Sequence, residues 1–142
     1  MSIESKYGLV WTISNELHDY TGKIVNLIVD HYLHIPALSY IDEMGLNTIR
    51  INLSIIPLSE SVIAHILSHE YGHHILKHVE TESYKLDSEE LEKREDEADV
   101  FAAKFIKNNK YQQEPIELFI SETSVSAEIA RKRIALLNTF SK

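Results

Sequence analysis

The chain has 142 residues, no cysteine and a formal net charge of −8. This length can bury one sizeable core but not two, so we expect a single domain spanning residues 1–142. The lack of cysteine excludes disulfides and thiolate metal sites, and the acidic balance argues against non-specific nucleic-acid binding, which rewards basic surfaces.

The first third of the chain shows no targeting or membrane signal. Residues 1–9 lack the basic start and apolar centre of a signal peptide, and polar residues interrupt the longest apolar stretch, Ile24–Ile35. We therefore expect a cytoplasmic protein without a membrane span. Residues 3–20 are ambiguous, with a helix as the best assignment, and residues 22–34 are predicted to form a helix. Its inward-facing residues would be Ile24, Leu27, Ile28 and either Tyr32 or Leu33.

A hairpin is predicted next. Residues 38–42 and 48–53 alternate apolar and polar side chains around residues 43–47, which contain a glycine and suit a turn. Because long helical stretches surround this hairpin, we expect the α+β class: a mostly helical domain with a small antiparallel sheet beside the helix that follows.

That helix is predicted over residues 60–78. Pro57 precedes it, and either Ser59 or Ser61 can cap its first free backbone N–H groups. Apolar residues recur every three or four positions, which is typical of a helix packed on a core. They are Val62, Ile63, Ile66, Leu67 and Ile75.

The helix carries the sequence His69-Glu70-Tyr71-Gly72-His73, an HExxH motif. Two histidines four residues apart project from one helix face and can bind one Zn²⁺ through neutral ring nitrogens. Glu70 is then placed to take a proton from an activated water. The alternative reading, core histidines satisfied by hydrogen bonds, explains a lone histidine better than this spaced pair with its intervening glutamate.

A third ligand is expected from another helix. Leu76 and Val79 stand where the extended HExxHxxGxxH motif requires glycine and histidine, so that motif fails. In the predicted helix 88–107, Glu95 lies on an otherwise apolar stripe, where a carboxylate needs a positive partner. Asp99, one turn later, can accept the outer N–H of a ligating histidine and orient its ring.

The remaining charged residues are predicted to be solvated. Ten of residues 80–99 are acidic and three are basic, and Glu97 in particular is assigned to the outer face of its helix. The predicted terminal helices, 115–122 and 126–140, have the arrangement of a helix-turn-helix. However, their only basic cluster is short, which favours a solvated surface over DNA recognition. It comprises Arg131, Lys132 and Arg133.

Four segments together resemble the ImmA/IrrE metallopeptidases of bacteria, phages and integrative elements. They are the strand-like Asn47–Asn52, the motif His69–Leu76, the downstream Glu95–Ala103 and the closing Val125–Ala130. The resemblance covers roughly residues 38–137. It implies a zinc peptidase whose substrate is a protein, typically a helix-turn-helix repressor encoded nearby.

By position, the resemblance places the Zn²⁺ ligands on His69, His73 and Glu95 and the catalytic glutamate on Glu70. The family's polar residue four positions after the third ligand corresponds to Asp99, although the family often has asparagine there. The chain departs from the family at His65, where a bulky apolar residue is usual, and at the polar segment 104–108. These departures concern the substrate groove and not the ligands.

The sequence leaves three matters open. The donor that would stabilise a tetrahedral oxyanion is not identified, and Tyr84, Tyr111 and His78 are candidates. A non-catalytic zinc protein that binds and sequesters a repressor is an alternative to the peptidase, although such a protein does not need Glu70. A DNA-binding module built on the terminal helices is a third possibility, which the acidic charge disfavours.

Overall fold

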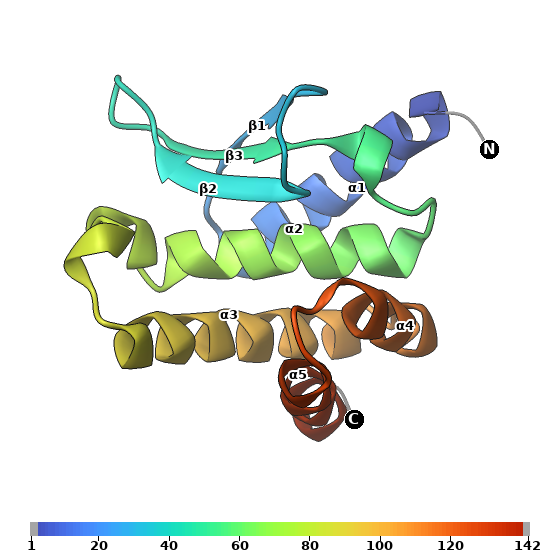
Figure 1. Ribbon diagram of the computed structural model, residues 1–142. Helices are drawn as coiled ribbons and strands as arrows, with labels where there is room; N and C mark the ends of the chain where they lie inside the picture. The colour runs from blue at the N-terminus through green and yellow to red at the C-terminus, as the bar shows by residue number, and fades with distance from the viewer. Residues whose placement is uncertain (1–2, 141–142) are drawn as a thin grey trace.

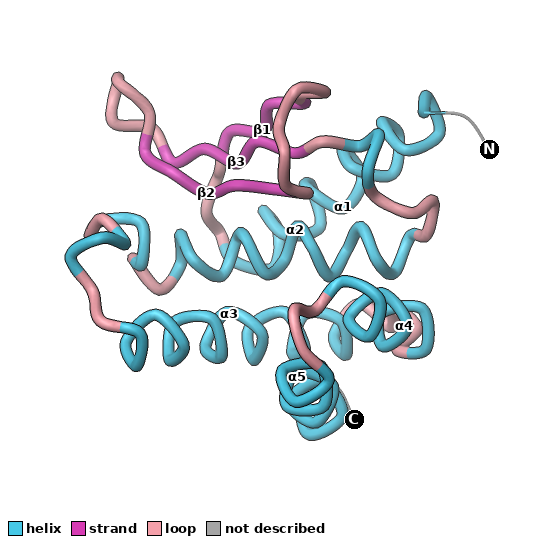
Figure 2. Tube along the Cα trace, in the orientation of Figure 1, coloured by secondary structure: helices cyan, strands magenta, loops and turns pink. Residues whose placement is uncertain are grey.

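The computed structural model describes residues 3–140. A three-stranded sheet lies on one side of the central helix α2, α3 lies on the other side, and α5 crosses α3 (Figure 1). Figure 2 shows the three strands gathered in one layer. The elements are α1 (Ile3–Thr21), β1 (Asn26–Val29), β2 (Ala37–Ile41), β3 (Asn47–Ile51), α2 (Glu60–Ile75), α3 (Ser88–Asn108), α4 (Glu114–Thr123) and α5 (Ala127–Phe140), with short 3-10 helices at Leu53–Ile55, His78–Glu80 and Ser83–Lys85.

Helix α2 is the centre of the molecule, because α1, β2, α3 and α4 all contact it. Its cap is Ser59, whose Oγ accepts a hydrogen bond from the Val62 N–H at 3.3 Å, and not Ser61. The helix ends at Ile75, three residues earlier than predicted, where Lys77 turns the backbone to a φ of 62°. Since α2 is covered on most sides, polar side chains on it need partners within the protein.

The α+β class and the single, mostly helical domain are confirmed, but the sheet is mixed and not wholly antiparallel. The predicted hairpin is present as β2 and β3, which pair antiparallel. β1 adds to the other side of β3 and runs parallel to it, so that the strand order is β1-β3-β2. β2 is therefore an edge strand that lies against α2.

The helix predicted over residues 22–34 is wrong. Gly22, at a φ of +70°, ends α1, and the following β-branched residues favour the extended strand β1. Ile24, which the helix would bury, is 72% exposed, and Tyr32, one of the two alternatives for the last inward position, is 91% exposed. Val25 is the residue of this segment that enters the core. The four residues of β1 are too few for their period of two to be distinguished from a helical period.

The other predicted helices are confirmed within two residues at each end. The ambiguous N-terminal segment is α1, and the last two helices are α4 and α5, with Ser126 accepting from the Ile129 N–H at 3.1 Å. Asp87 caps α3 by accepting from the Glu90 N–H at 2.8 Å. Among the described helices, none is long and apolar enough to cross a membrane.

Candidate metal centre

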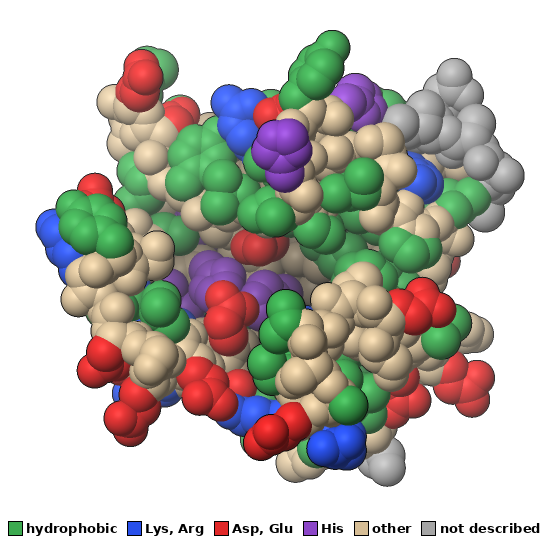
Figure 3. Space-filling model, viewed as in Figure 1, with side chains coloured by type: hydrophobic (Ala, Val, Ile, Leu, Met, Phe, Trp, Pro, Cys, Tyr) green, Lys and Arg blue, Asp and Glu red, His purple; other side chains and the backbone are tan. Residues whose placement is uncertain are grey.

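Helix α2 places His69 and His73 side by side in a hollow between the sheet and α3. Histidine side chains gather in this hollow, with acidic side chains beside them (Figure 3). The Nε2 atoms of His69 and His73 are 3.2 Å apart, and the two side chains are only 12% and 13% exposed. The one-turn spacing on the helix thus brings two ring nitrogens together in a shielded position.

Glu95 reaches the same point from α3. Its Oε2 lies 2.8 Å from His69 Nε2, and its Oε1 lies 3.5 Å from His73 Nε2. One ligand atom from each of the three residues falls within 4.8 Å of the others. Tetrahedral bonds of about 2.1 Å to Zn²⁺ separate ligand atoms by about 3.4 Å. The donor set of two imidazoles and one carboxylate, at these separations, fits a zinc ion.

Close packing of α2 on α3 makes this convergence possible. A Cβ atom added to Gly72 would lie 3.1 Å from Phe101 Cδ1, so glycine permits the approach of the two helices. On the facing side of α3, the small residues Ala98, Ala102 and Ala103 are fully buried. A larger residue at any of these positions would hold Glu95 away from the histidines.

Asp99 holds the outer nitrogen of His69, as the spacing predicts. Its Oδ1 lies 2.8 Å from His69 Nδ1, which leaves Nε2 directed at Glu95. Asp99 is itself bound by Arg133 of α5, with Nε to Oδ2 at 2.8 Å and Nη2 to Oδ1 at 3.0 Å. The Asp99 side chain is 5% exposed. Arg133 was predicted to be solvated, and that prediction is wrong.

His78 holds the outer nitrogen of His73, an arrangement that the sequence did not reveal. The Nδ1 atoms of His73 and His78 are 2.9 Å apart, and His78 Nε2 lies 3.3 Å from Glu97 Oε1. If His73 Nε2 faces a metal, its Nδ1–H donates to His78, whose Nε2–H in turn donates to Glu97. Glu97, assigned to a solvated face, is therefore part of this chain of contacts. Arg94 fixes the same segment by donating to the His78 carbonyl at 2.7 Å.

The electrostatics of the cluster favour a bound cation. Burial alone would lower the pKa of His69, but hydrogen bonds to Asp99 and Glu95 raise it to about 10. Burial would raise the pKa of Glu95, yet the hydrogen bonds from His69 and His73 hold it far below its usual range. A position that retains a proton so strongly is one at which a metal cation competes with that proton.

Glu70 points toward the sheet and meets Ser39 of β2. Ser39 Oγ lies 2.8 Å from Glu70 Oε2 and 3.0 Å from the Glu70 carbonyl. The single hydroxyl hydrogen of Ser39 is shared between these two acceptors, and either bond ties residue 70 of α2 to the edge strand. This contact fixes the carboxylate beside the two histidines, and no sequence signal pointed to Ser39.

Of the three candidates for an oxyanion donor, only His78 lies at the cluster. Tyr111 Oη donates to Glu16 at 2.6 Å, and burial together with this bond raises the pKa of Tyr111. Tyr84 is 78% exposed on a short 3-10 helix. His78 is already engaged by His73 and Glu97. Arg133, which lines a cavity together with Glu70, is a further cation at this place, and the sequence did not point to it.

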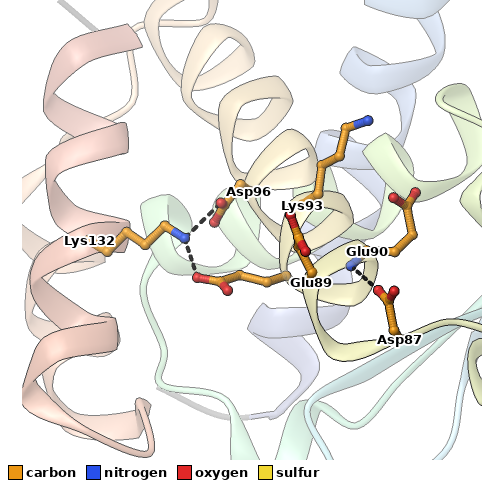
Figure 4. A pocket seen from close by; sticks show the side chains of 7 residues that line it. Asp87, Glu89, Glu90, Lys93, Asp96 and Lys132 are labelled. Carbon is orange, nitrogen blue, oxygen red and sulfur yellow. Dashed lines mark hydrogen bonds and ion pairs between the residues drawn. The ribbon is translucent and has the colours of Figure 1, made fainter.

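The acidic segment 80–99 is partly neutralised by α5. Lys132 Nζ lies 2.8 Å from Asp96 Oδ2 and also contacts Glu92, bridging α5 to α3 (Figure 4). Asp87, Glu89 and Glu90 line the same shallow surface pocket. The predicted basic cluster is therefore paired with acids and offers no free basic surface, apart from the exposed Arg131.

A family model described as Peptidase U49 matches residues 53–136, which is more than half of the chain. The chain belongs to the peptidase U49 family. No curated protein and no solved structure matches the chain significantly.

The matched range contains most of the residues of the histidine cluster and its surroundings, namely His69, Glu70, His73, His78, Glu95, Glu97, Asp99 and Arg133. It begins after β3, so the sheet and Ser39 lie outside the range that defines the family resemblance. Membership of the U49 family thus supports peptidase activity. The structure shows that His69, His73 and Glu95 of this chain come together at one point.

Proposed function

We propose that this U49 peptidase is zinc-dependent, with His69, His73 and Glu95 as the metal ligands and Glu70 as the general base. The observation that carries the proposal is the convergence of three ligand atoms within 4.8 Å beside a carboxylate that belongs to the same helix turn. Two further contacts support it, because the outer nitrogens of both histidines are held by other side chains.

When bound, Zn²⁺ supplies Lewis acidity, which makes a water molecule more acidic and polarises a peptide carbonyl. The protein side chains then perform the proton transfers. Glu70 accepts a proton from the attacking water and delivers it to the departing amine. Ser39 holds the Glu70 carboxylate in place during both transfers, and Asp99 keeps His69 in the tautomer that presents Nε2.

The substrate peptide would lie along β2. One edge of this strand pairs with β3, its other edge pairs with no strand of the described residues, and it supplies Ser39 to the general base. An extended peptide can pair with such an edge through main-chain hydrogen bonds, which is a common mode of peptide recognition. Its scissile carbonyl would then lie beside Glu70 and the two histidines.

The resemblance to ImmA/IrrE proteins suggests which protein is cut. We infer a helix-turn-helix repressor as substrate, attracted in part by the acidic segment 80–99. Because Lys132 and Arg133 are paired with acids of α3 and the net charge is −8, we expect no direct binding to nucleic acid.

The test compares the wild type with Glu70→Gln. Both should carry about one zinc per chain by elemental analysis and have the same circular dichroism. Cleavage of a pool of unstructured peptides, followed by mass spectrometry, should fall by about 10²–10⁴-fold in the variant. Glu89→Gln, on an exposed turn of α3, is the matched control and should cut normally.

A repressor-release assay separates this proposal from the alternative. Where a helix-turn-helix repressor is encoded beside the gene, the wild type should relieve repression and Glu70→Gln should not. If Glu70→Gln relieves repression as well as the wild type, the protein acts by binding and sequestering the repressor, and the catalytic proposal fails.

A further inference from the structure

A cavity of about 240 Å³ opens beside Glu70 and His69, between the start of β2 and helices α2, α4 and α5. One part of its wall is apolar and consists of Pro36, Ala37, Ile66 and Phe119. The other part is polar and consists of His65, Thr123 and Arg133. A cavity of this size next to the general base can receive one side chain of a peptide whose backbone follows β2.

Arg133 has hydrogen-bond donors to spare at this cavity. Its Nε and Nη2 are used by Asp99, whereas Nη1 makes no hydrogen bond to any residue that the structure describes. The side chain is 26% exposed, so part of the guanidinium is open to the cavity that it lines. A guanidinium only donates, so Nη1 can donate to an acceptor on a ligand in the cavity.

His65 contributes a second donor. The residue is 3% exposed, and its Nε2 lies 3.5 Å from Arg133 Nη2. Because the guanidinium cannot accept, Nε2 is the acceptor and the ring hydrogen resides on Nδ1. Nδ1 is buried and has no hydrogen-bond partner among the described residues. A buried donor without a partner costs free energy, and because His65 lines the cavity, a small rotation of its ring that brings Nδ1 to an acceptor there would remove that cost.

Thr123 offers the complementary group. Its hydroxyl already donates to the Phe119 carbonyl at 2.7 Å, so its oxygen is left as an acceptor at the cavity mouth. The polar part of the cavity thus combines two donors with one acceptor. A carboxamide has the matching set, since its oxygen accepts and its NH₂ group donates.

The local charge favours a neutral group over a carboxylate. Glu70 lines the cavity, Asp99 lies behind Arg133 and Glu95 lies on the other side of His69. These three carboxylates offset the charge of the Arg133 guanidinium and the two charges of a bound zinc ion, so the cavity has no net positive charge. A ligand carboxylate would therefore lose its hydration without a compensating charge, whereas a carboxamide carries no charge to desolvate.

We propose that this cavity is a specificity subsite that binds the side chain of a glutamine or asparagine next to the scissile bond. The aliphatic part of the side chain packs against Ile66 and Phe119, and its carbonyl oxygen accepts from Arg133 and His65. The proposal rests on the proposed peptidase function, because it takes a peptide as the occupant. His65 is the residue that sets the preference.

Binding is tested first, independently of cleavage. Propionamide and ethyl methyl sulfide, which mimic the side chains of glutamine and methionine, are titrated into the zinc-loaded full chain. The methyl resonances of Ile66 report occupancy. The wild type should bind propionamide about tenfold more tightly, and His65→Leu should abolish or reverse this preference. His65→Asn, which retains a donor near the position of Nδ1, should keep most of it.

Thr123→Val should weaken propionamide binding by a few-fold, whereas Thr139→Val should have no effect. Thr139 is the matched control, because its hydroxyl makes the same kind of bond to a helix carbonyl, that of Ala135, outside the cavity. Circular dichroism and zinc content verify that each variant is folded. A folded His65→Leu protein that still prefers propionamide tenfold would overturn the proposal. If His65→Leu does not fold, unchanged propionamide binding in a folded Thr123→Val protein would do the same.

Cleavage profiling then separates this proposal from the proposed function. Peptides cut by the wild type should be enriched in glutamine or asparagine at one position beside the scissile bond, and His65→Leu should lose that enrichment. Peptides cut without such enrichment, or with enrichment of glutamate, would overturn the subsite and leave the peptidase intact. Selective propionamide binding without any cleavage would support the cavity and contradict the catalytic proposal.

Discussion

His69 and His73 lie one turn apart on α2, yet different kinds of neighbours hold their outer nitrogens. His69 is held by Asp99, a buried carboxylate that Arg133 binds through two hydrogen bonds. His73 is held by His78, a neutral ring whose own partner, Glu97, is 43% exposed. Burial and the neighbouring His73 lower the pKa of His78, which keeps it uncharged near neutral pH.

Asp99 therefore holds His69 more strongly than His78 holds His73. A buried charged acceptor makes a strong hydrogen bond and increases the basicity of the ring that donates to it. A neutral ring makes a weaker bond, and an exposed carboxylate behind it is screened by water. We therefore expect His69 to be the fixed ligand and His73 to be the one that can adjust.

The largest expected effect follows from Asp99→Asn. This change leaves Arg133 without its carboxylate and weakens the support of His69, so zinc affinity should fall by about 10–100-fold. The free energy of unfolding should fall by about 2–3 kcal/mol, somewhat less than for a fully buried pair, because Arg133 is partly exposed. Zinc affinity is measured by competition with a chromogenic chelator, and stability by urea unfolding.

Asp96→Asn is the matched control for Asp99→Asn. Asp96 lies on the same helix and also pairs with a cation of α5, Lys132, but this pair is at the surface. We expect its zinc affinity to stay within twofold of the wild type. Equal zinc loss in the two variants would mean that general weakening of the contact between α3 and α5, and not the orientation of His69, is responsible.

A smaller effect is expected from His78→Leu. Removal of the ring leaves the His73 Nδ1–H to bind water, so the zinc dissociation constant should rise by about three- to tenfold. The change in unfolding free energy should be below that of Asp99→Asn, because His78 lies on a short 3-10 helix outside the core. If His78→Leu lost as much zinc affinity as Asp99→Asn, the supports of His69 and His73 would be equally strong and the comparison would fail.

The proposed metal ligands could be predicted from the sequence because the signals for them lie close together in the chain. His69, Glu70 and His73 lie within five residues on one helix, and Glu95 and Asp99 stand out as acids on the buried face of another. In each pair, His69 with His73 and Glu95 with Asp99, a spacing of four residues places both side chains on one face of the helix. The same reasoning gave α2, α3 and the hairpin, whose patterns are long or marked by a turn.

The missed residues act across long sequence separations. Ser39 reaches Glu70 from 31 positions away, and Arg133 reaches Asp99 from 34 positions away. Which face of α5 or β2 points at the site depends on packing, which helical or strand periodicity does not specify. The error at β1 has the same origin, because pairing with β3 stabilises a segment that is too short to show its own period.

The smallest effect is expected from Glu97→Gln, which tests directly whether His73 is held without the help of a charge. The amide oxygen can still accept from His78 Nε2, so the chain from Glu97 through His78 to His73 keeps its geometry and loses only a charge. Because that charge is exposed, zinc affinity should change less than twofold and unfolding free energy by less than about 0.5 kcal/mol. Competition with the chelator at low and high salt provides the measurement, and neither value should depend on salt. A tenfold loss at low salt that disappears at high salt would show that His73 is held by charge as His69 is, and the two sides of the centre would then be equivalent.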